Sequence, residues 1–457
     1  MLVKALSVVV GLTLAVAADA QIIVTSPLAV AARLKVFPHP GFPGLYQLTL
    51  TGTASGVDEY FLFYVPGTGT ASTPLVVGFH SYSVSPNQFL NLPAAEVINQ
   101  AALHNWYAVC PMGAYDVNFG VWKWQANVEE VLDWVDDHYN IDHDRVYGIG
   151  FSMGGNWMMS YAARHADPTR PMFAAVVNHT GGMSLTYTHA QGDPTVNAIL
   201  EHPLMLEGPP TGQYLFGYLR SQSINLDPFT LAVDQTNDMA RNLTHVDVYN
   251  FHSDNDTLLT SVPLKTSVDK FNAQLQLRLS QASSTIGAGG GSTQLVVGPD
   301  LPNVPPHSWG ELDIPAAFTW LAGQTRSIPS ASGGPGIICD RNGRWFHMDV
   351  TLGTATNFAT FVWGLAAGQN RFGILASNNL AKVFIRSAEV GLVTTNPSNP
   401  VILNLASADS TTDEVSLNGF ATPPLVTPPG TQWSHDPATG TVTIFTLGTF
   451  QSVTLTP

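Results

Sequence analysis

One serine in this sequence stands between two glycines, in a pattern that can produce a nucleophile. The stretch from Arg145 to Gly155 reads RVYGIGFSMGG, and Ser152 is the centre of its G-x-S-x-G motif. An apolar run precedes the motif and a helical pattern follows it, so we expect Ser152 on a tight strand-to-helix turn. Glycine is needed on both sides because larger side chains would collide there. The turn strains the serine and exposes its hydroxyl to a substrate.

A serine nucleophile needs a base, and His307 has the place in the chain that suits this role. In folds whose nucleophile lies on such a strand-to-helix turn, the acid follows the nucleophile in the chain and the histidine comes last. His307 lies in the segment PPHSW at 305–309, directly before a predicted helix at 311–321. We therefore expect His307 to accept the serine proton and to return it to the leaving group.

The acid is expected in the loop that follows an apolar run at 246–251. That loop reads HSDND from His252 to Asp256, so Asp254 and Asp256 are both candidates. Either carboxylate would orient the imidazole and stabilise its charged form. The alternation of His252, Asp254 and Asp256 also permits a metal site. Alternate positions of one short loop rarely converge on an ion without distant ligands, so we expect no metal and no cofactor.

A longer stretch around the serine carries a resemblance to a known family. The run NVEEVLDWVDDHYNIDHDRVYGIGFSMGG, from Asn127 to Gly155, resembles the polyhydroxybutyrate depolymerase and feruloyl esterase branch of the α/β-hydrolases. In that branch a helix, an I-D-x-x-R-V-Y lead-in and the nucleophile turn come in this order. The tetrapeptide SMGG is also similar to that of cutinases and poly(ethylene terephthalate) hydrolases. The resemblance covers residues 46–326 and implies an α/β-hydrolase fold that acts on esters.

The resemblance also implies roles for single residues. In that branch the loop of the acid reads H-G-x-x-D with the last Asp catalytic, which selects Asp256; Ser253 stands where the family has glycine. It further implies that Tyr82 donates one backbone N–H to the carbonyl oxygen of the substrate. Here Ser81 replaces the glycine that usually precedes this residue in the family.

Acyl transfer builds negative charge on the carbonyl oxygen, and two positioned N–H donors stabilise it. The backbone N–H of Met153, directly after the nucleophile, is the expected first donor, with Tyr82 as the second. His179 follows the run at 173–177 and is expected to face the mouth of the site. We regard His179, Trp309 and the ring of Tyr82 as candidate substrate contacts, and His80 as a structural residue of its loop.

Composition limits the classes of partner. The chain has 457 residues and a formal net charge of −15, and only 11% of its residues are charged. A nucleic-acid partner requires a basic face, so we expect no nucleic-acid binding. The low charge predicts a neutral polar surface and contact with neutral, polymeric ester substrates. The two cysteines, Cys110 and Cys339, are expected to be unpaired buried thiols, and the chain is expected to be a monomer.

The first residues are typical of an export signal. Lys4 is followed by an apolar stretch at 5–17 and by Ala18-Asp19-Ala20, a small-x-small cleavage site. This pattern predicts a signal peptide at 1–20 and a secreted protein, extracellular or periplasmic. The alternative, a membrane anchor, is disfavoured because the stretch is short for a bilayer span. No later segment reads as a transmembrane helix.

Between residues 21 and 326, apolar runs alternate with helical patterns. Such alternation predicts a mostly parallel sheet with helices on both faces, the α/β-hydrolase arrangement. An antiparallel pair is expected at the edge of the sheet, at 46–51 and 59–65. Further strands, each covered on both faces, are expected at 74–79, 107–110, 146–149, 173–177, 246–251 and 294–297. Helices are expected at 127–138, 155–165, 261–281 and 311–321. Residues 180–245 exceed the minimal fold and are predicted to form part of a cap and substrate cleft or, as the alternative, an extension of the core.

The pattern changes after residue 326. Residues 327–336 read SIPSASGGPG and are predicted to be a linker. Residues 337–457 contain short β-like segments without a convincing helix, which predicts an all-β, sandwich-like accessory domain. Its role stays open between binding of a polymer and stabilisation of the enzyme.

Three hypotheses follow from these patterns. The leading one is a secreted serine carboxylic-ester hydrolase acting on polyhydroxyalkanoate, aromatic polyester, or feruloyl and acetyl esters of polysaccharide. A serine peptidase of the same fold is the second hypothesis, because it would use the same three residues. The third is a non-catalytic surface protein in which the C-terminal region carries the function.

Overall fold

The computed structural model describes residues 34–38, 42–67, 72–254, 256, 261–284, 290–298, 301–329, 336–366, 369–406, 414–445 and 450–457. The predicted signal peptide at 1–20 and residues 330–335 of the predicted linker lie outside these ranges. No helix of the described residues is long and apolar enough to cross a membrane.

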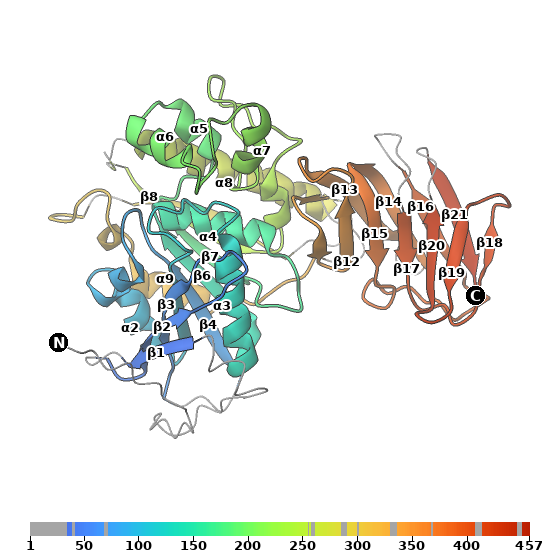
Figure 1. The fold of residues 1–457 in the computed structure, drawn as a ribbon, viewed down its shortest axis with the longest axis horizontal. Helices are drawn as coiled ribbons and strands as arrows, with labels where there is room; N and C mark the ends of the chain where they lie inside the picture. Colours follow the sequence, from blue (N-terminus) through green and yellow to red (C-terminus); the bar gives the residue numbers. More distant parts are fainter. Residues whose placement is uncertain are drawn as a thin grey trace.

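A nine-stranded sheet forms the centre of the larger, N-terminal part of the molecule (Figure 1). Its strands lie in the order β1-β2-β3-β5-β4-β6-β7-β8-β9. Pairs among β1, β2, β3 and β5 are antiparallel, and every later pair is parallel. The strands are β1 (Leu34–Pro38), β2 (Leu45–Leu50), β3 (Glu59–Tyr64), β4 (Thr73–Phe79), β5 (Tyr107–Pro111), β6 (Ile141–Phe151), β7 (Ala175–His179), β8 (Asp247–Ser253) and β9 (Thr293–Gly298). The predicted α/β-hydrolase arrangement is thus the observed one.

Helices cover both faces of this sheet, which explains why its central strands are continuously apolar. Leu75, Val77 and Phe79 of β4 pack into one core, whereas Val76 packs into the core on the opposite face. The first core also holds residues of α3 (Gln125–His138), α4 (Met153–Arg164) and α8 (Ser261–Ser284). The second core holds residues of α2 (Glu96–Leu103) and α9 (Ile314–Leu321).

Two expectations about the sheet need correction. Strand β9 was expected to be covered on both faces, but most of its residues are only half-buried because it pairs with β8 alone. The antiparallel pair β2–β3 was expected at the edge, but β1 lies outside it. Helix α2 was not expected from the sequence either.

The segment 180–245, which we call the cap, forms a group of short elements above the sheet (Figure 1). It contains α5 (Leu185–Ala190), α6 (Pro194–Leu200), η2 (Gly212–Tyr214), α7 (Leu215–Leu219) and η3 (Met239–Leu243). A small core of its own joins Leu185, Leu200 and Tyr218 to Val121 and Trp124 of a loop on the hydrolase side. This small core fixes the segment to the top of the sheet.

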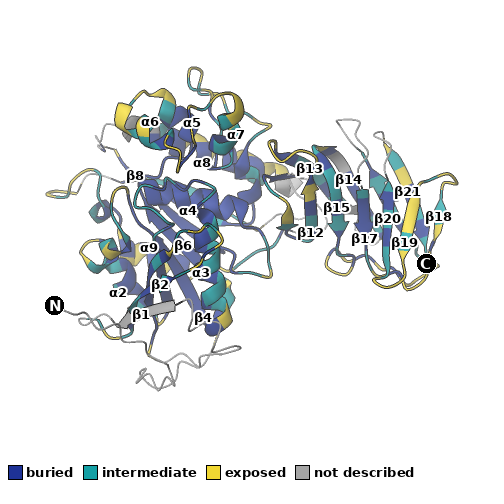
Figure 2. Ribbon diagram, in the orientation of Figure 1, coloured by how far each residue is buried: buried dark blue, intermediate teal, exposed yellow. Residues whose placement is uncertain are grey.

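The C-terminal part consists of two six-stranded sheets that share one core (Figure 2). Among its described residues no helix occurs. The first sheet contains β10 (Ile337–Cys339), β13 (Ala359–Ala366), β14 (Arg371–Asn378), β16 (Val401–Leu405), β21 (Gln451–Thr456) and β18 (Leu425–Thr427). The second contains β11 (Gly343–Trp345), β12 (Met348–Leu352), β15 (Leu380–Ile385), β17 (Glu414–Leu417), β20 (Thr441–Phe445) and β19 (Trp433–Asp436).

The two parts are joined by polar contacts that are themselves buried. Oδ2 of Asp340 forms two ion pairs, one with Nη2 of Arg164 at the end of α4 and one with Nε of Arg220 in the segment 180–245, each over 2.7 Å. The carboxylate of Asp340 has no exposure to solvent. The side-chain amide of Asn242 forms hydrogen bonds with both the N–H and the C=O of Ile338. Cys110 and Cys339 are free thiols in different cores, as predicted.

Candidate active site

Ser152 lies in the turn between β6 and α4, with backbone angles φ 55° and ψ −122° that few non-glycine residues adopt. A Cβ on Gly150 would lie 2.3 Å from the carbonyl oxygen of Gly154. A Cβ on Gly154 would lie 2.2 Å from the carbonyl oxygen of Phe79. Both positions therefore exclude any side chain, which is the steric reason for the G-x-S-x-G pattern.

Three side chains that are far apart in the sequence meet at this turn. Nε2 of His307 lies 2.9 Å from Oγ of Ser152, and Nδ1 of His307 lies 2.7 Å from Oδ2 of Asp256. Asp256 is only 2% exposed, and the ring of His307 packs against that of Phe151. In this arrangement the imidazole can accept the serine proton while the carboxylate holds the ring and stabilises its charge.

The alternative acid and the alternative metal site do not assemble. Asp254 accepts a hydrogen bond from Nζ of Lys265 at its backbone carbonyl, and Asp256 is the residue that reaches His307. His252 directs Nε2 to Asp269, 3.1 Å away. In the part of the chain that the structure describes, no three His, Cys, Asp or Glu side chains gather around a possible metal position.

The backbone N–H groups of Met153 and Tyr82 form no hydrogen bond with another described residue, and both residues line a cavity together with Ser152. Met153 is the first residue of α4, where N–H groups have no partner within the helix. Tyr82 belongs to the loop after β4. These groups can donate to an oxygen that develops negative charge near Ser152.

The loop that carries Tyr82 is held from two sides. His80 is fully buried, and its Nε2 lies 2.9 Å from the carbonyl oxygen of Met112. On the other side Gln88, from η1 (Pro86–Leu90), contacts both the N–H and the hydroxyl of Ser81. His80 thus has the structural position that the sequence predicted.

His179 does not face the mouth of the site, and this expectation is corrected. It ends β7 below the nucleophile turn, where Ser152 N–H donates to its backbone oxygen over 2.9 Å. Its ring is 1% exposed and packs among Phe151, Phe251 and Trp309. Burial lowers the pKa of His179 well below its usual value, and the nearby His307 lowers it further; both effects favour the neutral ring.

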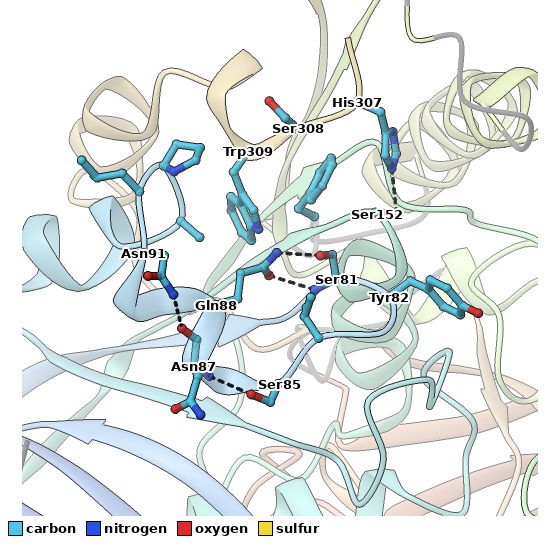
Figure 3. A pocket seen from close by; sticks show the side chains of 15 residues that line it. Ser81, Tyr82, Ser85, Asn87, Gln88, Asn91, Ser152, His307, Ser308 and Trp309 are labelled. Atoms are coloured by element: carbon cyan, nitrogen blue, oxygen red, sulfur yellow. Dashed lines mark hydrogen bonds between the residues drawn. The ribbon is translucent and has the colours of Figure 1, made fainter. Parts of the chain in front are cut away.

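Ser152 lines two cavities. The first cavity, which we call the amide cleft, has a volume of about 680 Å³ and is lined by Ser152, His307 and Trp309 (Figure 3). It takes its name from the side-chain amides of Asn87, Gln88 and Asn91, which also line it. The second, which we call the cap pocket, has a volume of about 300 Å³ and includes Ser152, Met153 and side chains of the cap. Tyr82 lines both cavities, and Trp309 lines the amide cleft, so these two predicted contacts do lie at a site.

Sequence reasoning did not find three residues that shape this site. Gln88 holds the loop of Tyr82, and Phe119 lines the cap pocket with its backbone in the left-handed region at φ 48°. Asn156 of α4 stabilises that conformation by donating Nδ2 to the carbonyl oxygen of Phe119 over 2.7 Å. The only local signal there is Gly120, a residue type frequent in turns, which follows Phe119.

No protein-family model matches the chain, and no curated protein matches it. Solved structures with a similar fold include the S-formylglutathione hydrolase from Agrobacterium tumefaciens, with 13% identity, a TM-score of 0.41, and coverage of 63% of this chain and 98% of that one. A ferulic acid esterase has 15% identity, a TM-score of 0.40, and coverage of 63% and 98%. An acetyl xylan esterase from Paenibacillus sp. R4 has 13% identity, a TM-score of 0.39, and coverage of 64% and 88%. The fold described above rests on the strand order and not on these likenesses.

Proposed function

We propose that this protein is a serine hydrolase that cleaves carboxylic esters through an acyl-enzyme. The observation that supports this proposal most directly is the continuous hydrogen-bonded series from Ser152 through His307 to Asp256. It lies beside the two unpartnered N–H groups of Met153 and Tyr82 and opens into two cavities. A nucleophile, a base, an orienting acid and oxyanion donors are the complete set that acyl transfer requires.

In the first half of the reaction, Oγ of Ser152 attacks the ester carbonyl carbon while Nε2 of His307 accepts the hydroxyl proton. The carbonyl oxygen becomes an oxyanion and receives hydrogen bonds from the N–H groups of Met153 and Tyr82. Nδ1–H of His307 stays bonded to Asp256, which stabilises the imidazolium. When the bond between the carbonyl carbon and the alkoxy oxygen breaks, His307 gives its proton to that oxygen and the alcohol leaves.

The second half repeats these steps with water. His307 accepts a proton from water as the water oxygen attacks the acyl carbon, and the second oxyanion uses the same donors. Collapse breaks the bond to Oγ of Ser152, and His307 returns the proton to that oxygen. The products are a carboxylic acid and an alcohol, and the enzyme is unchanged.

We further propose that the natural substrates are polyester or polysaccharide-linked esters outside the cell. Export is supported by the first twenty residues, and a neutral material is favoured because 11% of the residues are charged. Release of acid from polyester film, compared with release of ferulate or acetate from plant polysaccharide, separates these two classes.

The first experiment is hydrolysis of p-nitrophenyl esters of short and medium chain length. We expect Ser152→Ala to lower turnover to less than a few per cent of wild type, and a fluorophosphonate probe to label the wild type and not the variant. Ser434→Ala, at an exposed position of β19, is the matched control and is expected to retain full turnover. Substantial turnover by Ser152→Ala would contradict the proposal, and preferential cleavage of peptide nitroanilides would support a peptidase instead.

A further inference from the structure

We infer that the two cavities divide the ester between them, with the acyl group in the cap pocket and the alcohol in the amide cleft. This inference rests on the proposed function, because it concerns how an ester lies across Ser152. It names the chemistry of both halves of the substrate: a medium-sized apolar acyl group and a neutral, oxygen-rich alcohol.

The position of His307 sets the orientation. His307 must give its proton to the departing alkoxide, so the alcohol has to lie on the same side of Ser152 as the imidazole. His307 lines the amide cleft but not the cap pocket. The acyl chain therefore extends into the other cavity, the cap pocket, which Met153 lines and where its N–H can donate to the carbonyl oxygen.

The cap pocket has walls suited to an apolar group. Phe119, Leu185, Val196 and Leu264 line it, and its volume of about 300 Å³ limits the length of the acyl chain. Asp193 is the charged residue among its described lining, and its carboxylate accepts hydrogen bonds from the backbone at the start of α6. A second carboxylate at the far end of the acyl group would meet this charge, so half-esters of dicarboxylic acids are disfavoured.

We place the border between the two cavities at Tyr82, which lines both, and at Phe119, which lines the cap pocket beside it. Their ring centroids are 5.7 Å apart, and Asn156 holds Phe119 in its strained conformation. Strain of this kind persists only where the surroundings enforce it, which is common at ligand sites. A fixed border keeps the acyl chain from turning into the amide cleft.

The amide cleft is lined by uncharged polar side chains, in contrast to the apolar walls of the cap pocket. Its described lining contains no Asp, Glu, Lys or Arg, and Figure 3 shows Ser85, Asn87, Asn91 and Ser308 around its rim. Asn87 and Asn91 are exposed, and Nδ2 of Asn87 and Oδ1 of Asn91 form no hydrogen bond within the described chain, so they can donate to a ligand oxygen and accept from a ligand hydroxyl. Uncharged donors and acceptors beside an aromatic floor, here Trp309, suit the hydroxyls of a sugar or the next ester unit of a polyester.

The acyl half is tested with Val196→Trp, which fills the cap pocket. We expect the kcat/KM ratio of p-nitrophenyl hexanoate to p-nitrophenyl acetate to fall about tenfold or more, the scale at which one methylene is discriminated. Val393→Trp, at an exposed valine of the C-terminal part, is the matched control and should keep the wild-type ratio. The ratio of kcat/KM for a sugar ester to kcat/KM for the ethyl ester of the same acid should be the same in Val196→Trp as in wild type.

The alcohol half is tested with the double variant Asn87→Leu and Asn91→Leu. Wild type is expected to prefer a glucose ester or a hydroxybutyrate dimer over the ethyl ester of the same acid, and the double variant should lose this preference about tenfold. The two substrates distinguish a saccharide from a polyester source. Asn99→Leu on α2 is the matched control.

The outcomes separate the two proposals. If wild type hydrolyses no ester and the fluorophosphonate probe does not label it, the proposed function fails. If esters are hydrolysed but Val196→Trp changes the alcohol preference and the double Asn variant changes the chain-length profile, the orientation is reversed and this inference is overturned. Unchanged ratios in both variants overturn it as well.

Discussion

The side chain of Gln88 is hydrogen-bonded twice to Ser81, the residue directly before Tyr82. Nε2 of Gln88 donates to Oγ of Ser81 over 2.7 Å, and the N–H of Ser81 donates to Oε1 of Gln88 over 3.1 Å. The family that this sequence resembles has glycine at the position of Ser81. This chain has a hydroxyl side chain there instead, and Gln88 holds it by a hydrogen bond. The pair fixes the loop from which Tyr82 presents its N–H.

Gln88→Leu removes both hydrogen bonds and is expected to lower kcat on p-nitrophenyl acetate about tenfold to a hundredfold with little change in KM. The reason is that a displaced oxyanion donor weakens the transition state more than the bound substrate. Steady-state kinetics on the folded variant measure this division.

Ser81→Gly serves as the partner in a double-mutant cycle. Since both residues act through one contact, the double variant should be no slower than Gln88→Leu alone. Additive losses in kcat would show that Gln88 acts independently of Ser81, against the role in positioning the loop.

The geometry distinguishes two carboxylates that are two positions apart. Asp256→Asn is expected to lower kcat by about 10⁴-fold, because the amide cannot hold the imidazole in the required tautomer. Asp254→Asn is the control and should remain near wild type, since its recorded contact with Lys265 uses the backbone oxygen. Ester hydrolysis near neutral pH measures both, and equal losses in the two variants would refute the assignment of Asp256.

Asp340 links the C-terminal sheets to α4 and the cap through a fully buried carboxylate. Asp340→Ala leaves Arg164 and Arg220 without their partner, so we expect a loss of about 3–5 kcal/mol in the free energy of unfolding. Asp349→Ala breaks a partly exposed pair with Arg386 and should cost about 1 kcal/mol or less. Urea unfolding measures both, and similar small losses would show that Asp340 does not stabilise the junction.

The same carboxylate gives a pH dependence. Burial acts to raise the pKa of Asp340, but Arg164 and Arg220 outweigh it and hold the pKa well below its usual range. The contribution of Asp340 to stability is therefore present above its unfolded-state pKa of about 3.9 and is lost only as the pH falls below that value. The difference in unfolding free energy between wild type and Asp340→Ala, measured at pH 3 and pH 6, should therefore be smaller at pH 3, and equal differences at the two pH values would contradict this.

The contribution of Glu59 to the free energy of unfolding depends on pH in the opposite direction. Burial raises its pKa to about 7, against the hydrogen bonds from Ala114, Gly113, Asn127 and Met112. Because the folded-state pKa is the higher one, the associated stability is present below about pH 4.3 and is lost as the pH rises through 7. We expect wild type to lose about 3 kcal/mol of unfolding free energy between pH 4.5 and pH 8 relative to Glu59→Gln. Parallel pH profiles for the two proteins would contradict this.

The sequence by itself determined the features that depend on near neighbours. The G-x-S-x-G spacing predicts the strained turn because Gly150 and Gly154 exclude side chains within a few residues of Ser152. Apolar runs predicted the strands of the central sheet because its central strands are buried on both faces. The chain order of serine, acid and histidine followed from the order of those strands.

Only the tertiary structure decided how distant residues combine. His179 has the local pattern of a site residue, yet packing of aromatic rings from three elements encloses it. Gln88 and Asp340 have no local signal, because their roles depend on partners that reach them only when the sheet, the cap and the C-terminal strands have packed. Periodicity along a chain reports which face of an element is buried, but it carries no information on which side chain lies opposite.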